Sequence, residues 1–138
     1  MGKLQNPFQL LLPKERWVPT GDYDTLFHSD YETLIPPLVY KVRLAVNEWR
    51  ENGYNGASDT TKSLLNFWFE TEHIENENKF QFFFSQRESV ESIIYLYEMA
   101  KAKDKYDLMR FDSSGRISLN MFDETWTRYV VKMATGAG

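Results

Sequence analysis

Apolar side chains recur at the spacing of an amphipathic helix in residues 35–49, and this pattern limits the fold more than any other feature of the sequence. The apolar positions fall at i, i+3, i+4 and i+7, and Pro36 and Pro37 are tolerated because the first turn of a helix needs no backbone donor. The set comprises Ile35, Leu38, Val39, Val42, Ala45, Val46 and Trp49. We expect a helix that ends at Gly53 and turns one face toward a core.

A second helix is predicted from Ser85 to about Ala102. Ser85 and Glu88 have the spacing of a capping box, in which both side chains satisfy free amides of the first helical turn. The helical period continues through Val90, Ile93, Ile94, Tyr97 and Ala100 or Lys101. An aromatic run at residues 80–84 precedes this helix, and we expect it to be buried.

A third, shorter helix is predicted after the turn Asn55-Gly56, with either Ser58 or Thr60 as its N-cap. Its apolar face is formed by Leu64, Leu65, Trp68 and Phe69. Residues 70–79 show no period and are predicted to form a polar loop. Four acidic residues in this stretch are expected to be solvated, since carboxylates without a glycine-defined loop are a weak metal signal. They are Glu70, Glu72, Glu75 and Glu77.

Helix-surface spacing also marks a set of charged residues as a solvated face without a catalytic role. The set comprises Glu48, Arg50, Glu51, Glu88, Glu91 and Lys101. The net charge is −4 and Lys and Arg are nowhere dense, so we expect these residues alone to bind nucleic acid weakly.

Metal and membrane sites are not predicted. The chain has no cysteine, and His28 and His73 lack the spacing of metal ligands. A secretory signal is not evident, and no apolar run approaches the roughly 20 residues that span a bilayer. We therefore expect a cytoplasmic protein.

The last eleven residues combine a β-rich apolar run, residues 128–133, with the glycine-rich sequence at residues 134–138. A buried parallel strand that leads into a glycine-rich turn begins a P-loop, because backbone amides must face a phosphate without side chains in the way. The complete motif needs Lys and then Ser or Thr after Gly138. On this pattern alone, a flexible tail explains the residues equally well.

Several segments resemble one family. Residues 130–138, Val-Val-Lys-Met-Ala-Thr-Gly-Ala-Gly, resemble the Walker A form Met-Ala-Thr-Gly-x-Gly-Lys-Thr of superfamily 2 helicases in type I and type III restriction enzymes. Asn6-Pro7-Phe8 with Arg16-Trp17, residues 46–56 and residues 82–91 resemble stretches of large type III-like restriction subunits of the DEAD/DEAH-box class, in the same order. The resemblance covers most of the chain.

The resemblance implies a set of nucleotide-binding residues. Gln86 looks like the glutamine of the Q-motif, whose amide matches the donor and acceptor of the adenine edge. Thr135, Gly136, Ala137 and Gly138 would hold phosphate, with Ala137 in place of the more usual serine. The residues alone favour a capped helix terminus as the role of Gln86. Phe82 and Phe84 are similarly expected to pack in the core rather than against a base.

The fold expected from these observations is mainly α with a small β contribution. Residues 1–79 would form an accessory region, with an extended proline-rich arm and two helices, and residues 80–138 would begin a RecA-like α/β lobe that stops at the P-loop. The resemblance implies a fragment of an ATP-dependent DNA helicase or translocase subunit of a restriction-modification enzyme. Neither catalytic nor metal-ligating residues are assigned, because the acidic motifs of hydrolysis and cleavage are missing from these 138 residues.

The longer protein would use ATP and magnesium and would bind double-stranded DNA and a modification methyltransferase subunit. The fragment alone is expected to bind no cofactor, and an open sheet edge would favour self-association. An alternative is a self-contained helical interaction module, in which aromatic helix faces form a partner surface and the glycine-rich end is a flexible tail.

Overall fold

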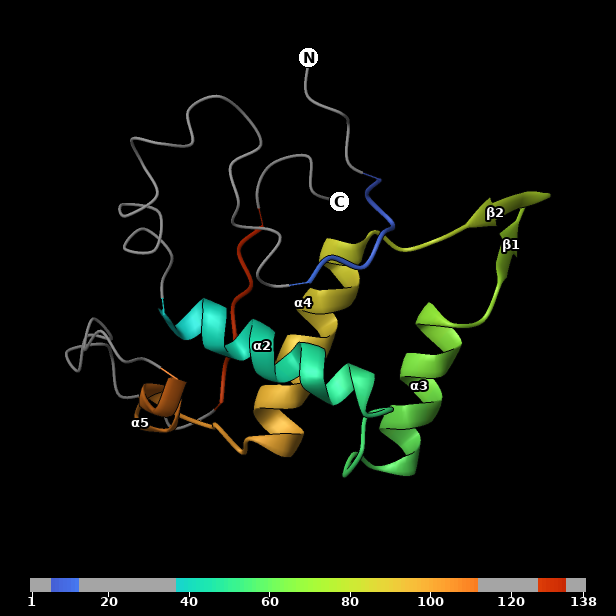
Figure 1. Ribbon diagram of the computed structural model, residues 1–138. Helices are drawn as coiled ribbons and strands as arrows, with labels where there is room; N and C mark the ends of the chain where they lie inside the picture. The colour runs from blue at the N-terminus through green and yellow to red at the C-terminus, as the bar shows by residue number, and fades with distance from the viewer. Residues whose placement is uncertain (1–5, 13–36, 112–126, 134–138) are drawn as a thin grey trace, which may run out of the picture.

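The computed structural model describes residues 6–12, 37–111 and 127–133, and these are mainly helical with one small antiparallel sheet, as predicted (Figure 1). The longer elements are α2 (Pro37–Glu51), α3 (Asp59–Phe69) and α4 (Phe84–Ile94), with β1 (His73–Glu75) and β2 (Asn78–Phe80) between α3 and α4. A π-helical turn η2 (Tyr95–Met99) extends α4, and α5 (Lys105–Leu108) and the 3-10 turn η3 (Met109–Phe111) follow. None of the helices described in these ranges is long and apolar enough to span a membrane.

Helix α2 follows the predicted pattern. It buries Val46 and Trp49 and stops near Gly53, whose positive φ of 64° suits a residue without a Cβ atom. Gly56 has a φ of 84°, and a Cβ atom there would lie 2.7 Å from Cε of Met99. The loop after α2 can therefore lie directly on η2.

The N-terminus of α3 is capped by Ser58, one of the two predicted residues. The Ser58 hydroxyl accepts a hydrogen bond from the Thr61 amide at 3.2 Å. The Glu98 carboxylate of η2 accepts from the Ser58 amide at 2.5 Å and from the Thr61 hydroxyl at 2.6 Å. These contacts lower the pKa of Glu98, the bond from Thr61 most, and they join α3 to the end of the α4–η2 helix.

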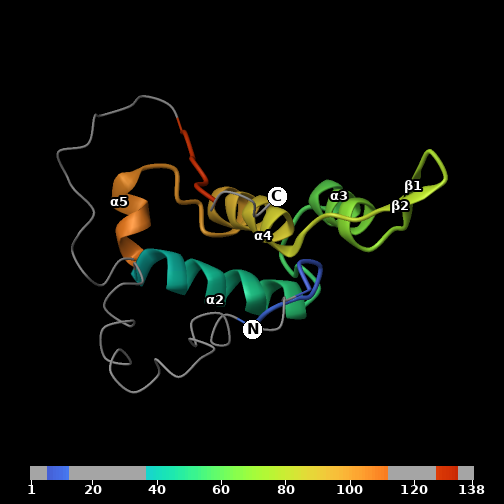
Figure 2. The ribbon, with the colours of Figure 1, turned by 90° about the horizontal axis from the view of Figure 1, so that it is seen from above.

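The prediction of a loop at residues 70–79 is wrong, because β1 and β2 pair as an antiparallel hairpin. The register places His73 opposite Phe80 and Glu75 opposite Asn78. Positive φ values of 49° at Asn76 and 66° at Glu77 form the tight turn that such hairpins require. Glycine is usual at the second of these positions, and its absence hid the turn in the sequence. Figures 1 and 2 show the hairpin projecting beyond α3, away from α2 and α4.

The predicted capping box at the start of α4 is also wrong. The helix begins at Phe84, so Ser85 lies inside the first turn, and Glu88 instead forms an ion pair with Arg43 of α2 at 3.4 Å. Phe84 is buried as expected, whereas Phe80 is 43% exposed because it lies on the projecting hairpin. The predicted length of this helix is nearly reached, because η2 continues α4 to Met99.

The core lies where α2, α3 and the α4–η2 helix meet. Trp49, Ala57 and Leu65 form its buried centre. The Trp49 ring contacts Tyr54 and Tyr95, with centroid distances of 4.9 and 5.6 Å. Partly buried side chains surround this centre: Tyr54, Trp68, Phe69, Val90, Ile94, Tyr95 and Met99.

Residues 6–12 form an N-terminal arm that lies across the start of α4. The Phe84 amide, which has no acceptor within its own helix, donates to the Pro7 carbonyl oxygen at 2.8 Å. Phe8 stacks on Phe83 with a centroid distance of 5.2 Å. The arm thus supplies a cap that α4 lacks locally.

Residues 127–133 are extended, but they pair with no strand in the described part of the chain, so the predicted buried strand is wrong here. Val130 is 85% exposed. The segment runs antiparallel to α4 (Figure 1): the Tyr129 hydroxyl donates to the Ala102 carbonyl oxygen near one end, and the Ser89 hydroxyl lies 3.3 Å from Sδ of Met133 near the other. A parallel sheet needs further strands, and none is available among these residues.

Candidate functional site

Gln86 occupies the third position of α4 and its side chain turns back on the helix terminus. Its Oε1 atom accepts a hydrogen bond from the Phe83 amide at 2.9 Å. Gln86 thus takes the capping role that was predicted for Glu88, whereas the residues alone favoured it only as the first residue of a capped helix. An amide oxygen has a second lone pair and an amide nitrogen has two donors, so capping leaves hydrogen-bonding capacity for a ligand.

Gln86 also lines a small apolar pocket of about 200 Å³. Its other walls come from α3, from the segment before α4 and from the next turn of α4, and they are Trp68, Phe69, Phe82 and Val90. A hollow with aromatic walls and one amide suits an aromatic ring that has hydrogen-bonding atoms on its edge. The volume accommodates a base, whereas the rest of a nucleotide would extend outside.

The two phenylalanines considered for base stacking differ in position. Phe82 lines the pocket and packs edge-on against Phe69 and Phe80, with centroid distances of 5.6 and 4.9 Å. Phe84 is only 6% exposed and packs under the Arg50 guanidinium, 5.4 Å from its Cζ atom. Core packing is therefore confirmed for Phe84, while Phe82 both packs and faces the pocket.

The remaining residues of the predicted nucleotide site, Thr135, Gly136, Ala137 and Gly138, lie outside the described residues. The segment that leads to them ends near the first turns of α4, where Met133 contacts Ser89. Ser89 follows Gln86 by three residues, about one turn of α4. Tertiary structure thus brings the residue just before the glycine-rich sequence close to the Gln86 end of α4.

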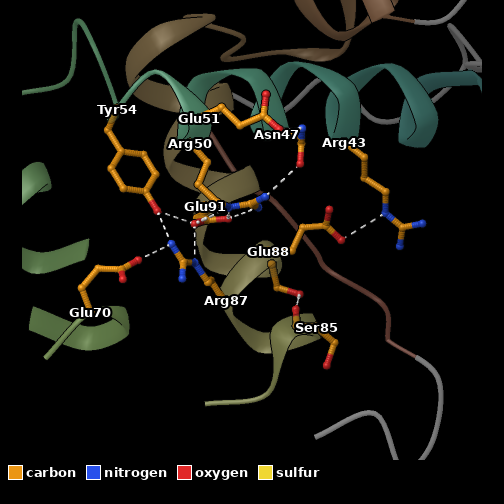
Figure 3. Close-up of polar contacts among 11 residues, drawn as sticks. Arg43, Asn47, Arg50, Glu51, Tyr54, Glu70, Ser85, Arg87, Glu88 and Glu91 are labelled. Carbon is orange, nitrogen blue, oxygen red and sulfur yellow. Dashed lines mark hydrogen bonds and ion pairs between the residues drawn. The ribbon is translucent and has the colours of Figure 1, made fainter. Parts of the chain in front are cut away.

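A buried ion-pair cluster lies between α2 and α4 (Figure 3). Glu91 is fully buried. Its Oε1 atom accepts hydrogen bonds from Nε of Arg50 at 3.0 Å and from Nε of Arg87 at 2.9 Å. The Tyr54 hydroxyl donates to Glu91 at 2.6 Å and accepts from Arg87 at 2.9 Å. Arg87 also reaches Glu70 at the end of α3, at 2.7 Å. Three helices therefore share one polar network.

The network shifts the ionisation of its members. Burial alone would raise the pKa of Glu91, but the hydrogen bonds and charge of Arg50, with those of Tyr54 and Arg87, lower it on balance. Burial and the hydrogen bond to Glu91 raise the pKa of Tyr54 to about 12. Burial opposes the charge of Arg87, yet its bonds to Glu91 and Tyr54 raise its pKa. Arg87 and Glu91 are thus held charged, and Tyr54 is held neutral.

The prediction that these charges form a solvated face is wrong for Arg50, Glu88 and Glu91, which the α2–α4 contact buries. It is confirmed for Glu48, Glu51 and Lys101, which are exposed. The sequence did contain a signal for this burial. Arg50, Arg87 and Glu91 carry opposite charges and fall on helix faces with few apolar residues, so these faces can pair with each other. A charged residue buried in a protein is almost always paired, and here the partner lies 41 residues away.

The cluster is suited to holding structure rather than to acid–base chemistry. Every charged group in it has a partner of opposite charge, and no shifted pKa lies near neutrality. Within the described residues, no three or more His, Asp or Glu side chains are arranged to hold a metal ion.

A search of protein families, curated proteins and solved structures found no match to this chain.

Proposed function

We propose that the chain forms the opening part of the nucleotide-binding lobe of an ATP-dependent DNA translocase or helicase subunit, of the kind found in restriction-modification enzymes. One observation supports the proposal most: the segment leading to the glycine-rich sequence reaches Ser89, which follows Gln86 by one turn of α4, and Gln86 lines an aromatic pocket. These two features are far apart in the sequence, yet an adenine contact and a phosphate loop must lie at one end of the same site.

The proposed adenine contact is Gln86. Its amide nitrogen would donate to a ring nitrogen of adenine, its oxygen would accept from the exocyclic amine, and Phe82 would cover one face of the base. Thr135, Gly136, Ala137 and Gly138 would provide the first amides for the phosphates, with ATP bound as its magnesium complex. Arg50, Arg87 and Glu91 would keep α4 fixed on α2, so that Gln86 is held in position.

The test uses the complete protein encoded by the gene, with magnesium-ATP binding measured by calorimetry. Gln86→Glu is the informative variant, because glutamate retains the oxygen that caps the Phe83 amide but loses the amide donor. We expect ATP binding to weaken by about 1–3 kcal/mol while the urea midpoint stays unchanged. Gln81→Glu, an exposed change of the same chemistry, is the control and should bind ATP normally.

Unchanged ATP affinity in Gln86→Glu would remove the adenine assignment. A reading frame in which Gly138 is not followed by Lys and then Ser or Thr would remove the phosphate loop and the whole proposal. The interaction module would then be the better explanation, and the exposed side chains Phe67 and Ile74 favour it independently.

A further inference from the structure

The end of α3 and the hairpin that follows it are acidic. Residues 70–80 contain four glutamates and one lysine, a net charge of −3 with His73 neutral, and the whole chain has a net charge of −4. The hairpin projects beyond α3 in both views (Figures 1 and 2). Negative charge on a projecting element repels nucleic acid and attracts a basic partner.

Large apolar side chains are exposed on the same part of the molecule. Ile74 is 70% exposed, Phe67 52% and Phe80 43%. Side chains alternate along a strand, so Ile74 lies on the face opposite to His73, which packs edge-on against Phe67. Apolar side chains bordered by charge on one projecting surface are typical of a protein contact site.

A cleft of about 170 Å³ opens where the hairpin meets α3 and the N-terminal arm. Its lining combines polar and charged side chains, among them Glu70, Glu72, Lys79 and Arg87, with aromatic and aliphatic ones. The aromatic and aliphatic part comprises Phe8, Leu10, Trp68, Phe69, Phe80, Phe82 and Phe84. The volume is smaller than the roughly 300–1,000 Å³ of pockets for drug-sized ligands, so it suits one large side chain rather than a whole metabolite. Protein partners commonly insert such a side chain as the anchor of an interface.

The charges at the edge of the cleft restrict what can approach. Glu70 forms an ion pair with Arg87, and Glu72 forms one with Lys79 at 3.0 Å. Glu75 is exposed on β1, and Glu77 is exposed in the turn. The negative charge that a partner meets first is therefore at the hairpin tip.

We infer that the hairpin and its cleft dock a basic, extended segment of a partner protein. One large apolar side chain of that segment occupies the cleft, and lysine or arginine side chains on it face Glu75 and Glu77. The inference goes beyond nucleotide binding and does not rest on it: Gln86 lines the neighbouring pocket and has no part in this cleft.

The experiment is a selection of random displayed peptides on this chain, followed by fluorescence anisotropy with the enriched peptides. We expect enriched peptides to combine several lysines or arginines with a single large apolar residue. Reversing both tip charges (Glu75→Lys with Glu77→Lys) should weaken their binding about tenfold. The control reverses two exposed charges on α2 (Glu48→Lys with Glu51→Lys) and should change binding less than about twofold.

A second arm tests the cleft and does not depend on charge. Phe80→Ala removes an exposed ring that borders the cleft and should weaken binding, whereas Tyr97→Ala removes a similarly exposed ring on η2 and should not. Added salt should weaken peptide binding to the unmodified chain. The inference fails if no peptide is enriched, if the enriched peptides lack basic residues, if both double variants behave alike, or if duplex DNA binds the hairpin instead.

Discussion

The α2–α4 contact and the α3–hairpin region are held together by different means. Charged side chains fill the first, where Glu91 is fully buried between Arg50 and Arg87. Aromatic rings packed edge-on connect the second, and several of them remain partly exposed. Glu91 and Arg50 of the first region are buried, with side chains 0% and 7% exposed, whereas the hairpin projects from the molecule (Figure 1).

The difference shows where each region can tolerate change. A buried charge that loses its partner has no water to replace the lost bonds, so the α2–α4 contact depends on every member of its network. Ion pairs on the hairpin lie in solvent, which screens them and takes over their bonds. The hairpin can therefore vary its charges without loss of fold, as a recognition surface must.

The largest effect should follow from Glu91→Gln, which keeps the shape of the side chain and removes its charge. Arg50 would remain buried without a carboxylate and Arg87 would keep only Glu70, so we expect stability to fall by about 3–5 kcal/mol. Urea unfolding measures the loss. Glu72→Gln is the control: it breaks the Glu72–Lys79 pair, whose side chains are 61% and 64% exposed, and should cost less than about 1 kcal/mol. Equal losses would mean that burial does not distinguish the two regions.

Tyr54→Phe should cost about 1–3 kcal/mol near neutral pH, because it removes the hydroxyl bonded to Glu91 and Arg87. A tyrosine whose pKa is raised in the folded state contributes stability below its ordinary pKa of 10.0 and loses it as the pH rises toward about 12. The stability difference between the unmodified chain and the variant should therefore shrink over that range. Urea unfolding at several alkaline pH values checks this, and a constant difference would contradict the assigned environment of Tyr54.

The smallest effect, and the only gain, is expected in the hairpin turn. Glu77 has a φ of 66°, which glycine adopts without steric cost, so Glu77→Gly should raise stability by up to about 1 kcal/mol. Glu75→Gly, two residues earlier in β1, should lower stability instead, because glycine weakens a strand. Thermal unfolding of the two variants provides the comparison, and a loss in both would show that the turn is not under strain.

Much of the helical architecture could be predicted from local sequence. The apolar period of α2, its stop at Gly53 and the Ser58 cap of α3 depend on residues a few positions apart, and the structure confirms all three. The start of α4 was predicted wrongly, because the Pro7 carbonyl of a distant segment caps the Phe84 amide and Gln86, in place of Ser85 and Glu88, caps the Phe83 amide. A local rule cannot include a cap that comes from 77 residues earlier in the chain.

The pocket was only partly predictable for the same reason. The resemblance singled out Gln86, and the side chain does lie at an aromatic pocket, but its walls at Trp68 and Phe69 come from another helix. The buried cluster of Arg50, Arg87 and Glu91 was mistaken for solvated surface, because the helical period places charges on a face without saying what covers it.

By itself, then, the sequence determined that α2, α3 and α4 are helices and where two of them begin or end, because backbone hydrogen bonds and caps join near neighbours. Only the tertiary structure decided that charges lie inside the α2–α4 contact, that residues 73–80 project as a hairpin, and that residues 127–133 run along α4 toward Gln86. These outcomes depend on contacts between residues more than 30 positions apart, or on whether another element covers a surface. A local sequence pattern contains neither kind of information.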